Sequence, residues 1–304
     1  MKAGIVGLPN VGKSTLFNCL SNAKAQSANF PFCTIEPNIG VVNVPDERLV
    51  KLEELVVPEK VIPATVEIVD IAGLVKGASK GEGLGNQFLG NIRETDAILH
   101  VLRCFDNDNI IHVDGNVDPI RDKETIDIEL QLKDLETVDK KLEKVKRSSR
   151  TGNKEAQKEE AVLIKIKDGL EQGVSLRAIE ISDKDREEFV TPLQFITDKP
   201  VMYVCNVDEA SAKTGNAHVD ALKNAVKDEN AEVLIISAAI EADIAQLESF
   251  DDRKSFLSDL GLEQSGVEQL IQKSYSLLHL ITYFTAGVKE VRAWTIQKGW
   301  KAPQ

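Results

Sequence analysis

Eight consecutive residues near the N-terminus have the types and the spacing of a phosphate-binding loop. The stretch from Gly7 to Ser14 reads Gly-Leu-Pro-Asn-Val-Gly-Lys-Ser and fits the pattern G-x-x-x-x-G-K-[ST]. Backbone N–H groups of such a loop surround phosphate oxygens, its lysine adds a charge at the β- and γ-phosphates, and its serine hydroxyl is available to Mg²⁺. With Lys13 and Ser14 in these roles, the sequence predicts a site for a nucleoside triphosphate.

Two later stretches have the residue types that respond to the γ-phosphate in P-loop GTPases. Thr34 lies in a small, polar segment after the loop's helix, where such enzymes place the threonine that closes over Mg²⁺. Asp70 ends an apolar stretch and begins the arrangement D-x-x-G, which ends at Gly73. We expect Asp70 to hold a Mg²⁺-bound water and the Gly73 N–H to reach the γ-phosphate. The predicted metal site is therefore Ser14, Thr34 and Asp70.

The residue that follows this arrangement predicts slow hydrolysis. Leu74 stands where Ras-like enzymes have the glutamine that orients the attacking water. Intrinsic turnover is then slow, or another group replaces the amide. His112, in a polar connector, is one candidate for that group, and a surface or packing role is the alternative. His100 lies inside an apolar run and is expected to be a core residue. The candidate catalytic residues are thus Lys13, Gly73 and His112.

A four-residue motif after a later apolar strand bears on the choice of base. GTPases have N-K-x-D at this point, whereas this chain has Asn206-Val207-Asp208-Glu209. The longer acid is misplaced for the two guanine contacts, and the Asn206 amide can meet the N6/N7 edge of adenine. We therefore expect ATP to bind at least as well as GTP. Ser237 and Ala238 follow the last apolar strand and correspond to the loop that backs the base.

The elements that position these residues alternate between short apolar strands and helical segments. This order predicts an α/β fold, a doubly wound parallel sheet with a P-loop. Helical spacing with an apolar seam between 125 and 170, broken at 150–153, predicts an inserted antiparallel helical hairpin. After 279 the pattern becomes strand-like. The predicted units are 1–122 and 198–278 for the nucleotide domain, 123–197 for the insert, and 279–304 for the incomplete start of a further domain.

Charge and composition limit the partners. The 304 residues carry a net charge of −12, which argues against nucleic-acid binding by the whole surface, and no DNA partner is expected. The predicted tip of the hairpin, however, is basic, and we favour contact with RNA phosphates over a merely solvated face. Its basic residues are Lys140, Lys141, Lys144, Lys146, Arg147, Arg150, Lys154 and Lys158. Four widely spaced cysteines and the lack of a membrane-length apolar run favour a soluble, cytoplasmic protein.

Taken together, the motifs resemble those of the YchF family of Obg-like ATPases, among the translation-factor-related P-loop NTPases. The resemblance rests on G-L-P-N-V-G-K-S, on D-I-A-G-L-V followed by G-A-S-K-G-E-G-L-G-N, on N-V-D-E, and on T-A-G-V-K-E-V-R-A-W-T. It implies a coiled-coil insert, a C-terminal TGS domain of β-grasp type, Mg²⁺-dependent hydrolysis of ATP in preference to GTP, and association with ribosomes. The resemblance covers essentially the whole chain.

The resemblance also assigns roles by position. It places the phosphates on Asn10, Val11, Gly12, Lys13, Ser14 and Thr15, and the base on Asn206, Val207 and Glu209. Relatives that respond to K⁺ have an asparagine at the position of Asn10, so K⁺ is a further expected cofactor. Two alternatives stay open at this point: a GTP-binding translation-factor-type GTPase, and a nucleotide-gated binding protein whose hydrolysis is incidental.

Overall fold

A six-stranded sheet forms the centre of the computed structural model, which describes residues 1–26, 39–71, 84–113, 115–229 and 231–301. The strand order is β2-β4-β1-β5-β6-β7. These strands are β1 (Lys2–Val6), β2 (Ile39–Asn43), β4 (Thr65–Asp70), β5 (Ala97–Arg103), β6 (Val201–Asn206) and β7 (Glu232–Ile236). β2 runs antiparallel to β4, and the other neighbouring strands of this sheet are parallel. The predicted α/β fold is confirmed.

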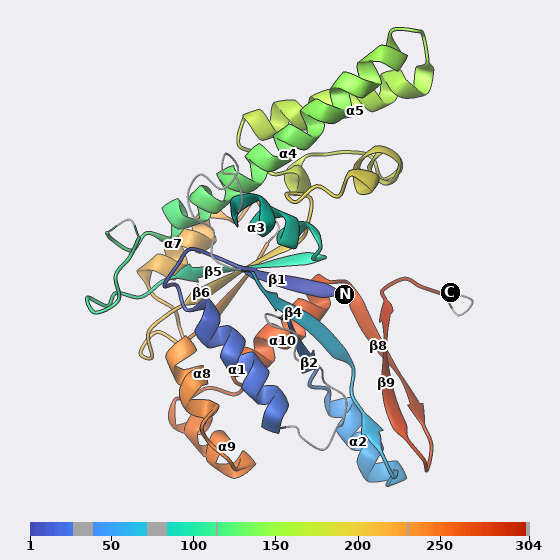
Figure 1. The fold of residues 1–304 in the computed structure, drawn as a ribbon. Coiled ribbons are helices and arrows are strands. Elements are labelled where there is room, and N and C mark those ends of the chain that lie inside the picture. The colour runs from blue at the N-terminus through green and yellow to red at the C-terminus, as the bar shows by residue number, and fades with distance from the viewer. Residues whose placement is uncertain (27–38, 72–83, 114, 230, 302–304) are drawn as a thin grey trace.

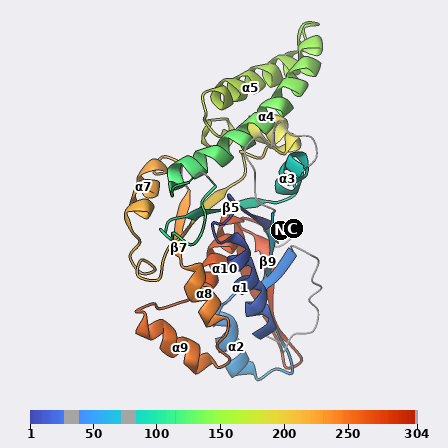
Figure 2. The same ribbon diagram turned by 60° about the vertical axis from the view of Figure 1, so that its left-hand side comes forward.

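Helices cover both faces of this sheet (Figures 1 and 2). One face carries α1 (Lys13–Gln26), α8 (Ala238–Ile244) and α10 (Gly266–Leu277), with α9 (Phe250–Asp259) beyond α8; the other carries α3 (Leu84–Arg93), α4 (Pro119–Ser149) and α7 (Ala217–Ala225). Every residue of β5 and β6 is buried. Central parallel strands covered on both faces are mostly apolar, which explains the apolar runs in these segments; their buried polar residues are His100 and Arg103 in β5 and Asn206 in β6.

A helical hairpin projects from the sheet and is made of α4 and α5 (Lys154–Glu171) (Figure 1). The Asp118 carboxylate accepts from the N–H groups of Ile120 and Arg121 and so caps α4. Asn153 caps α5 in the same way, after a turn in which Gly152 has a φ of 85°. The predicted hairpin is confirmed, and the proposed boundaries between units stay predictions.

Helix α4 belongs to two separate apolar cores. Near its start, Ile126 and Leu130 pack into the main core around the sheet. Farther along, Val138, Leu142 and Val145 pack in a second core with α5 and the segment that follows it. With 31 residues the helix is about 46 Å long, at 1.5 Å per residue. It therefore links the nucleotide domain to the end of the hairpin as one continuous element.

The chain returns from the hairpin to β6 through short helical turns and ends in a second, three-stranded sheet. The turns are η1 (Leu176–Ala178), α6 (Asp183–Asp185), η2 (Arg186–Val190) and η3 (Thr191–Leu193). The second sheet has the order β3-β9-β8 and consists of β3 (Val61–Ile62), β8 (Leu280–Ala286) and β9 (Val291–Gln297), beside α2 (Glu47–Val56). The Tyr275 hydroxyl on α10 donates to the carbonyl of Ile281 at 3.0 Å and so ties this sheet to the nucleotide domain.

Candidate nucleotide-binding site

The phosphate-binding loop joins the end of β1 to the start of α1, as predicted. Gly7 has a φ of 155°, and a Cβ atom there would lie 2.4 Å from the carbonyl oxygen of Val101. Gly12 has a φ of 99°, and a Cβ atom there would lie 2.3 Å from the amide nitrogen of Asn206. Both positions therefore require glycine for its conformation and for space. Between them, Asn10 is left-handed, with a φ of 62°.

The Lys13 ammonium group is folded back over this loop. Its Nζ atom donates to the carbonyl oxygens of Gly7, at 2.8 Å, and Leu8, at 2.7 Å. The side chain is only 8% exposed, and burial lowers the pKa of Lys13 to about 8, although the charge of Asp70 acts in the opposite direction. A buried cation with two neutral partners is a strong attractor for phosphate oxygens.

Asp70 lies at the end of β4, beside the end of β1, and its partner in the strand register is Ile5. Burial raises the pKa of Asp70, and the charge of Lys13 partly offsets that rise. Its Oδ1 atom is buried and has no hydrogen-bond partner among the described residues. An orphaned carboxylate oxygen of this kind fits a bound cation or its water.

Ser14 lies in the first turn of α1 and is exposed. A hydroxyl at a helix N-terminus and a buried carboxylate oxygen form a donor set that fits Mg²⁺, which is bound through few protein oxygens together with water and phosphates. The third predicted ligand, Thr34, lies outside the described residues, as do Gly73 and Leu74. Within the described ranges, no group of three or more His, Cys, Asp and Glu residues could hold a metal ion.

Asn206 joins the phosphate loop to the loop that follows β7. Its Nδ2 atom donates to the carbonyl of Val11 at 2.9 Å, and its Oδ1 atom accepts from the N–H of Ala238 at 2.9 Å. The side chain is 3% exposed. Both ends of this amide therefore bond to protein backbone, and the contact with adenine expected from the sequence stays a prediction. Here Asn206 is a brace of the phosphate loop.

The other residues predicted to shape the base pocket differ in exposure. Val207 is buried in the main core, and its N–H donates to the carbonyl of Ile236 at 2.9 Å. Glu209 is exposed. Ser237 is buried, and its Oγ atom has no hydrogen-bond partner within the described part of the chain. Asp70 and Ser237 thus each hold a buried polar atom that a ligand would satisfy.

The connector after β5 comes into contact with the phosphate loop. The Nδ2 atom of Asn10 donates to the carbonyl oxygen of Ile111 at 3.2 Å. The next residue, His112, is buried, with its Nε2 atom 2.8 Å from Oδ2 of Asp122 in the first turn of α4. The burial of His112 was not anticipated from the sequence, and its catalytic role stays a prediction. His100 is 1% exposed, burial lowers its pKa to about 3, and the prediction of a core histidine is confirmed.

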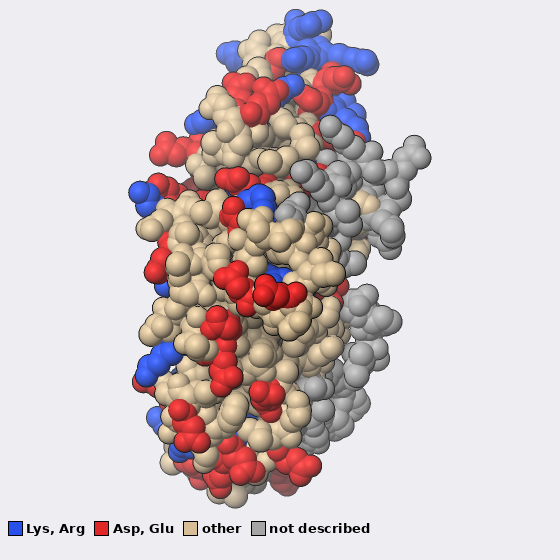
Figure 3. Space-filling view, turned by 90° about the vertical axis from the view of Figure 1, so that its left-hand side faces the viewer, with Lys and Arg blue, Asp and Glu red and all other residues tan. Residues whose placement is uncertain are grey.

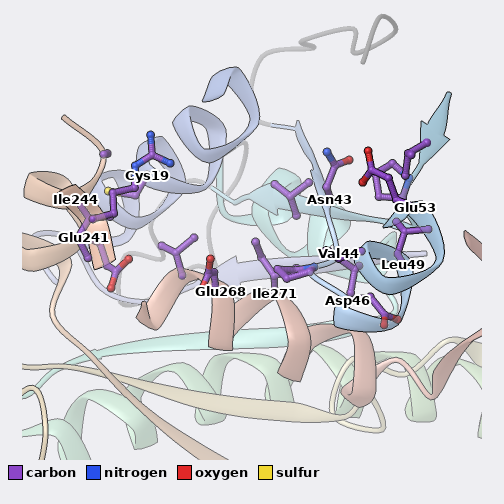
Figure 4. Close-up of a pocket in the computed structure, with 18 residues that line it drawn as sticks. Cys19, Asn43, Val44, Asp46, Leu49, Glu53, Glu241, Ile244, Glu268 and Ile271 are labelled. Atoms are coloured by element: carbon purple, nitrogen blue, oxygen red, sulfur yellow. The ribbon is translucent and has the colours of Figure 1, made fainter. Parts of the chain in front are cut away.

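A cavity of about 440 Å³ lies away from these residues, between α1, β2, α2 and α10 (Figure 4). Glu241 and Glu268 lie toward one end of it, whereas Leu49 and Glu53 lie toward the other. None of the predicted site residues lines it. Burial raises the pKa of Glu241 to about 7, although that carboxylate accepts from the N–H of Gly266 at 2.7 Å.

Comparison with protein families supports the nucleotide-binding assignment. Residues 2–145 match a family model described as a 50S ribosome-binding GTPase. Residues 280–304 match a second model, the YchF-GTPase C-terminal region, which is described as a protein of unknown function. In the described part of the chain, no helix has the length and apolar character needed to cross a membrane.

Relatives named as YchF proteins match over the full length of this chain. It is 53% identical to the "Ribosome-binding ATPase YchF" of Bacillus subtilis and 54% identical to that of Escherichia coli O157:H7, in each case over 100% of this chain and 83% of the relative. Among solved structures, the Schizosaccharomyces pombe YchF GTPase has a TM-score of 0.89 at 39% identity, covering 100% of this chain and 82% of the other. A GTP-binding protein from Pyrococcus horikoshii has the same fold, with a TM-score of 0.61 at 21% identity over 99% of this chain and 87% of the other.

Proposed function

This chain belongs to the YchF family of P-loop nucleoside triphosphatases, and on that premise we propose that it is an ATP-hydrolysing molecular switch that associates with ribosomes. The observation that carries the proposal is the 53% identity, over all of this chain, to a ribosome-binding ATPase. The phosphate loop, the buried Lys13 ammonium group and the orphaned oxygen of Asp70 support the nucleotide part independently.

The preference for ATP over GTP is argued from the motif at the end of β6. The names of relatives do not decide it, because the bacterial proteins are called ATPases and the fission yeast protein a GTPase. Guanine recognition in GTPases uses an aspartate and a lysine, and this chain has Glu209 and Val207 at those positions. Val207 is buried and has no cationic head to place along a purine ring. We therefore assign ATP as the stronger ligand and GTP as the weaker one.

The metal and the rate follow from the residues around the phosphates. Ser14 and Asp70, with Thr34, would hold Mg²⁺, which compensates phosphate charge when it is bound. Leu74 has no amide with which to orient a water, so turnover without a partner is slow. We assign the missing orientation to His112, one residue beyond the contact between Ile111 and Asn10. In that role the His112 imidazole would give up its contact with Asp122 and form a hydrogen bond to the attacking water instead.

The end of the helical hairpin fits contact with ribosomal RNA. Figure 3 shows Lys and Arg gathered there, whereas Asp and Glu are frequent over the lower part of the same face. Lys140 pairs with Glu136, and Lys141 pairs with Glu159 at 2.7 Å. The other six basic residues of the tip are exposed and make no ion pair within the described ranges. Unpaired cations on a projecting element are suited to phosphate contacts.

A continuous helix connects the site to this tip. Asp122, which holds His112, lies in the first turn of α4, and the basic tip lies at the other end of the same helix. A change at the His112–Asp122 pair would therefore act on the element that carries the proposed RNA contacts.

We also propose that the protein is located in the cytoplasm, with ribosomes. We further propose that K⁺ stimulates hydrolysis through Asn10. Equal turnover in Na⁺ and K⁺ would reject the role of K⁺.

Single-turnover hydrolysis and ribosome pelleting test this function. We expect slow hydrolysis of Mg²⁺-ATP that falls further in His112→Ala, and more protein pelleting with ribosomes in a non-hydrolysable ATP analogue than in ADP. Unchanged hydrolysis in His112→Ala would remove the histidine role. If Lys13→Ala, which removes the phosphate-binding charge, still pelleted as well as the wild type, the protein would be a binder that needs no nucleotide.

A further inference from the structure

Arg103 is a buried arginine that makes no ion pair with the described residues. It is the last residue of β5 and is 2% exposed. Within the described ranges, no carboxylate lies within ion-pair distance of its guanidinium group. Burying an unpaired cation is costly, so its hydrogen bonds must be satisfied in another way.

The guanidinium group instead binds three backbone carbonyls of one connector, residues 104–113. Nε donates to Phe105 at 3.1 Å, Nη1 to Ile110 at 2.9 Å, and Nη2 to Asn107 at 3.1 Å. The guanidinium carbon also lies 4.7 Å from the centre of the Phe105 ring. The connector has no regular helix or strand, so these contacts supply bonds that secondary structure would otherwise provide.

The same connector also contacts the phosphate loop. Ile111, directly after one clamped carbonyl, accepts from Asn10, and His112 follows it. Arg103 is also the register partner of Asn206, the brace of the phosphate loop. The ends of two neighbouring strands therefore hold the loop and the connector in one arrangement.

We propose that Arg103 is a positioning residue for hydrolysis, which acts by holding the connector so that Ile111 meets Asn10 and His112 lies beside the phosphates. The inference rests on the proposed ATPase function. A planar guanidinium reaches three separate carbonyls with donors that point in different directions, whereas a lysine has one nitrogen and cannot span them. Arg103→Lys therefore keeps the charge and removes the clamp.

The test compares Arg103→Lys with Arg253→Lys as a matched control. The guanidinium group of Arg253 on α9 likewise donates to backbone carbonyls, those of Leu247 and Glu248, and the residue lines the separate cavity. We expect Arg103→Lys to slow single-turnover ATP hydrolysis on the order of tenfold to a hundredfold. Its dissociation constant for ATP should change less than about threefold, since the phosphate loop keeps its own contacts. Arg253→Lys should leave both quantities unchanged.

The variant His112→Ala, alone and combined with Arg103→Lys, distinguishes the positioning role of Arg103 from the proposed ATPase function. If Arg103 acts through His112, the double variant hydrolyses ATP no more slowly than His112→Ala. If His112→Ala is slow but Arg103→Lys keeps the wild-type rate, the positioning role is overturned while the ATPase proposal stands. If His112→Ala keeps the wild-type rate, the histidine role fails, and this inference fails with it. Parallel losses of rate, affinity and melting temperature in Arg103→Lys would show a purely structural role and would also overturn the inference.

Discussion

Replacing Asn206 with aspartate tests whether this side chain braces the phosphate loop. The substitution preserves size and shape. The new carboxyl group can still accept from the N–H of Ala238, as the Oδ1 atom of Asn206 does at 2.9 Å. It has no hydrogen for the carbonyl of Val11, which now receives the Nδ2 hydrogen at 2.9 Å. An oxygen would face an oxygen in a site that is 3% exposed.

The expected size of the effect follows from that single lost donor. An unsatisfied buried acceptor costs about 1–3 kcal/mol, and we expect about 2 kcal/mol here. The loss should appear in nucleotide binding, because the ligand needs the phosphate loop in its braced form. An energy of about 2 kcal/mol corresponds to roughly thirtyfold weaker binding. Protonation of the new carboxyl group would restore a donor, so part of the affinity should return at acidic pH.

Equilibrium binding of a fluorescent ATP analogue measures the loss of affinity, and denaturant unfolding measures any change in the free energy of unfolding. Asn153→Asp is the matched control, because Asn153 only accepts backbone hydrogen bonds at its cap and an aspartate can do the same. The control should bind ATP as the wild type does. A dissociation constant for Asn206→Asp within about twofold of the wild type would refute the brace, since the lost bond would then carry no binding energy.

Three further predictions concern charge. The pKa of Lys13 is about 8, and bound phosphate favours the protonated form of this side chain. The affinity for ATP should therefore be constant below pH 8 and fall by up to about tenfold per pH unit above it. An ATP affinity that stays constant up to pH 9.5 would contradict this prediction. The pKa of Glu241 rises from 4.5 to about 7 on folding. The free energy of unfolding of the wild type should therefore fall by at most roughly 3 kcal/mol as the pH rises from 4.5 to 7. Denaturant titrations of Glu241→Gln should show no such pH dependence. Arg147→Glu at the hairpin tip should weaken ribosome pelleting and reduce its salt slope by about one, whereas Lys223→Glu on α7 should do neither; equal losses contradict a specific tip.

The parts of the site that were predictable are those whose geometry is local. The phosphate loop is contiguous, and its glycines at positions 7 and 12 are needed because a side chain would collide with Val101 or Asn206. The core strands were visible because both faces of the sheet are covered and most of their residues are apolar. The start of α4 was missed, because the helical spacing indicated the helix only from residue 125. Asp118 followed by Pro119, a common helix beginning, is the signal that could have located it.

The remaining parts depend on contacts between distant residues. Asn206 and Val11 are 195 positions apart, and no pattern in the chain joins an amide to that carbonyl. Arg103 ends an apolar strand, which is a local anomaly, yet its three partners are set by the path of an irregular connector. His112 was expected in a polar connector, and its pairing with Asp122 on the helix that follows, which accompanies its burial, could not be foreseen from the sequence.

The most direct test of the central claim is equilibrium binding of fluorescent ATP and GTP analogues with Mg²⁺, repeated on a variant with Val207→Lys and Glu209→Asp. We predict that the wild type binds ATP more tightly and that the double substitution moves the preference toward guanine. Tighter binding of GTP by tenfold or more, about 1.4 kcal/mol, would contradict it and would place this chain with the GTPases.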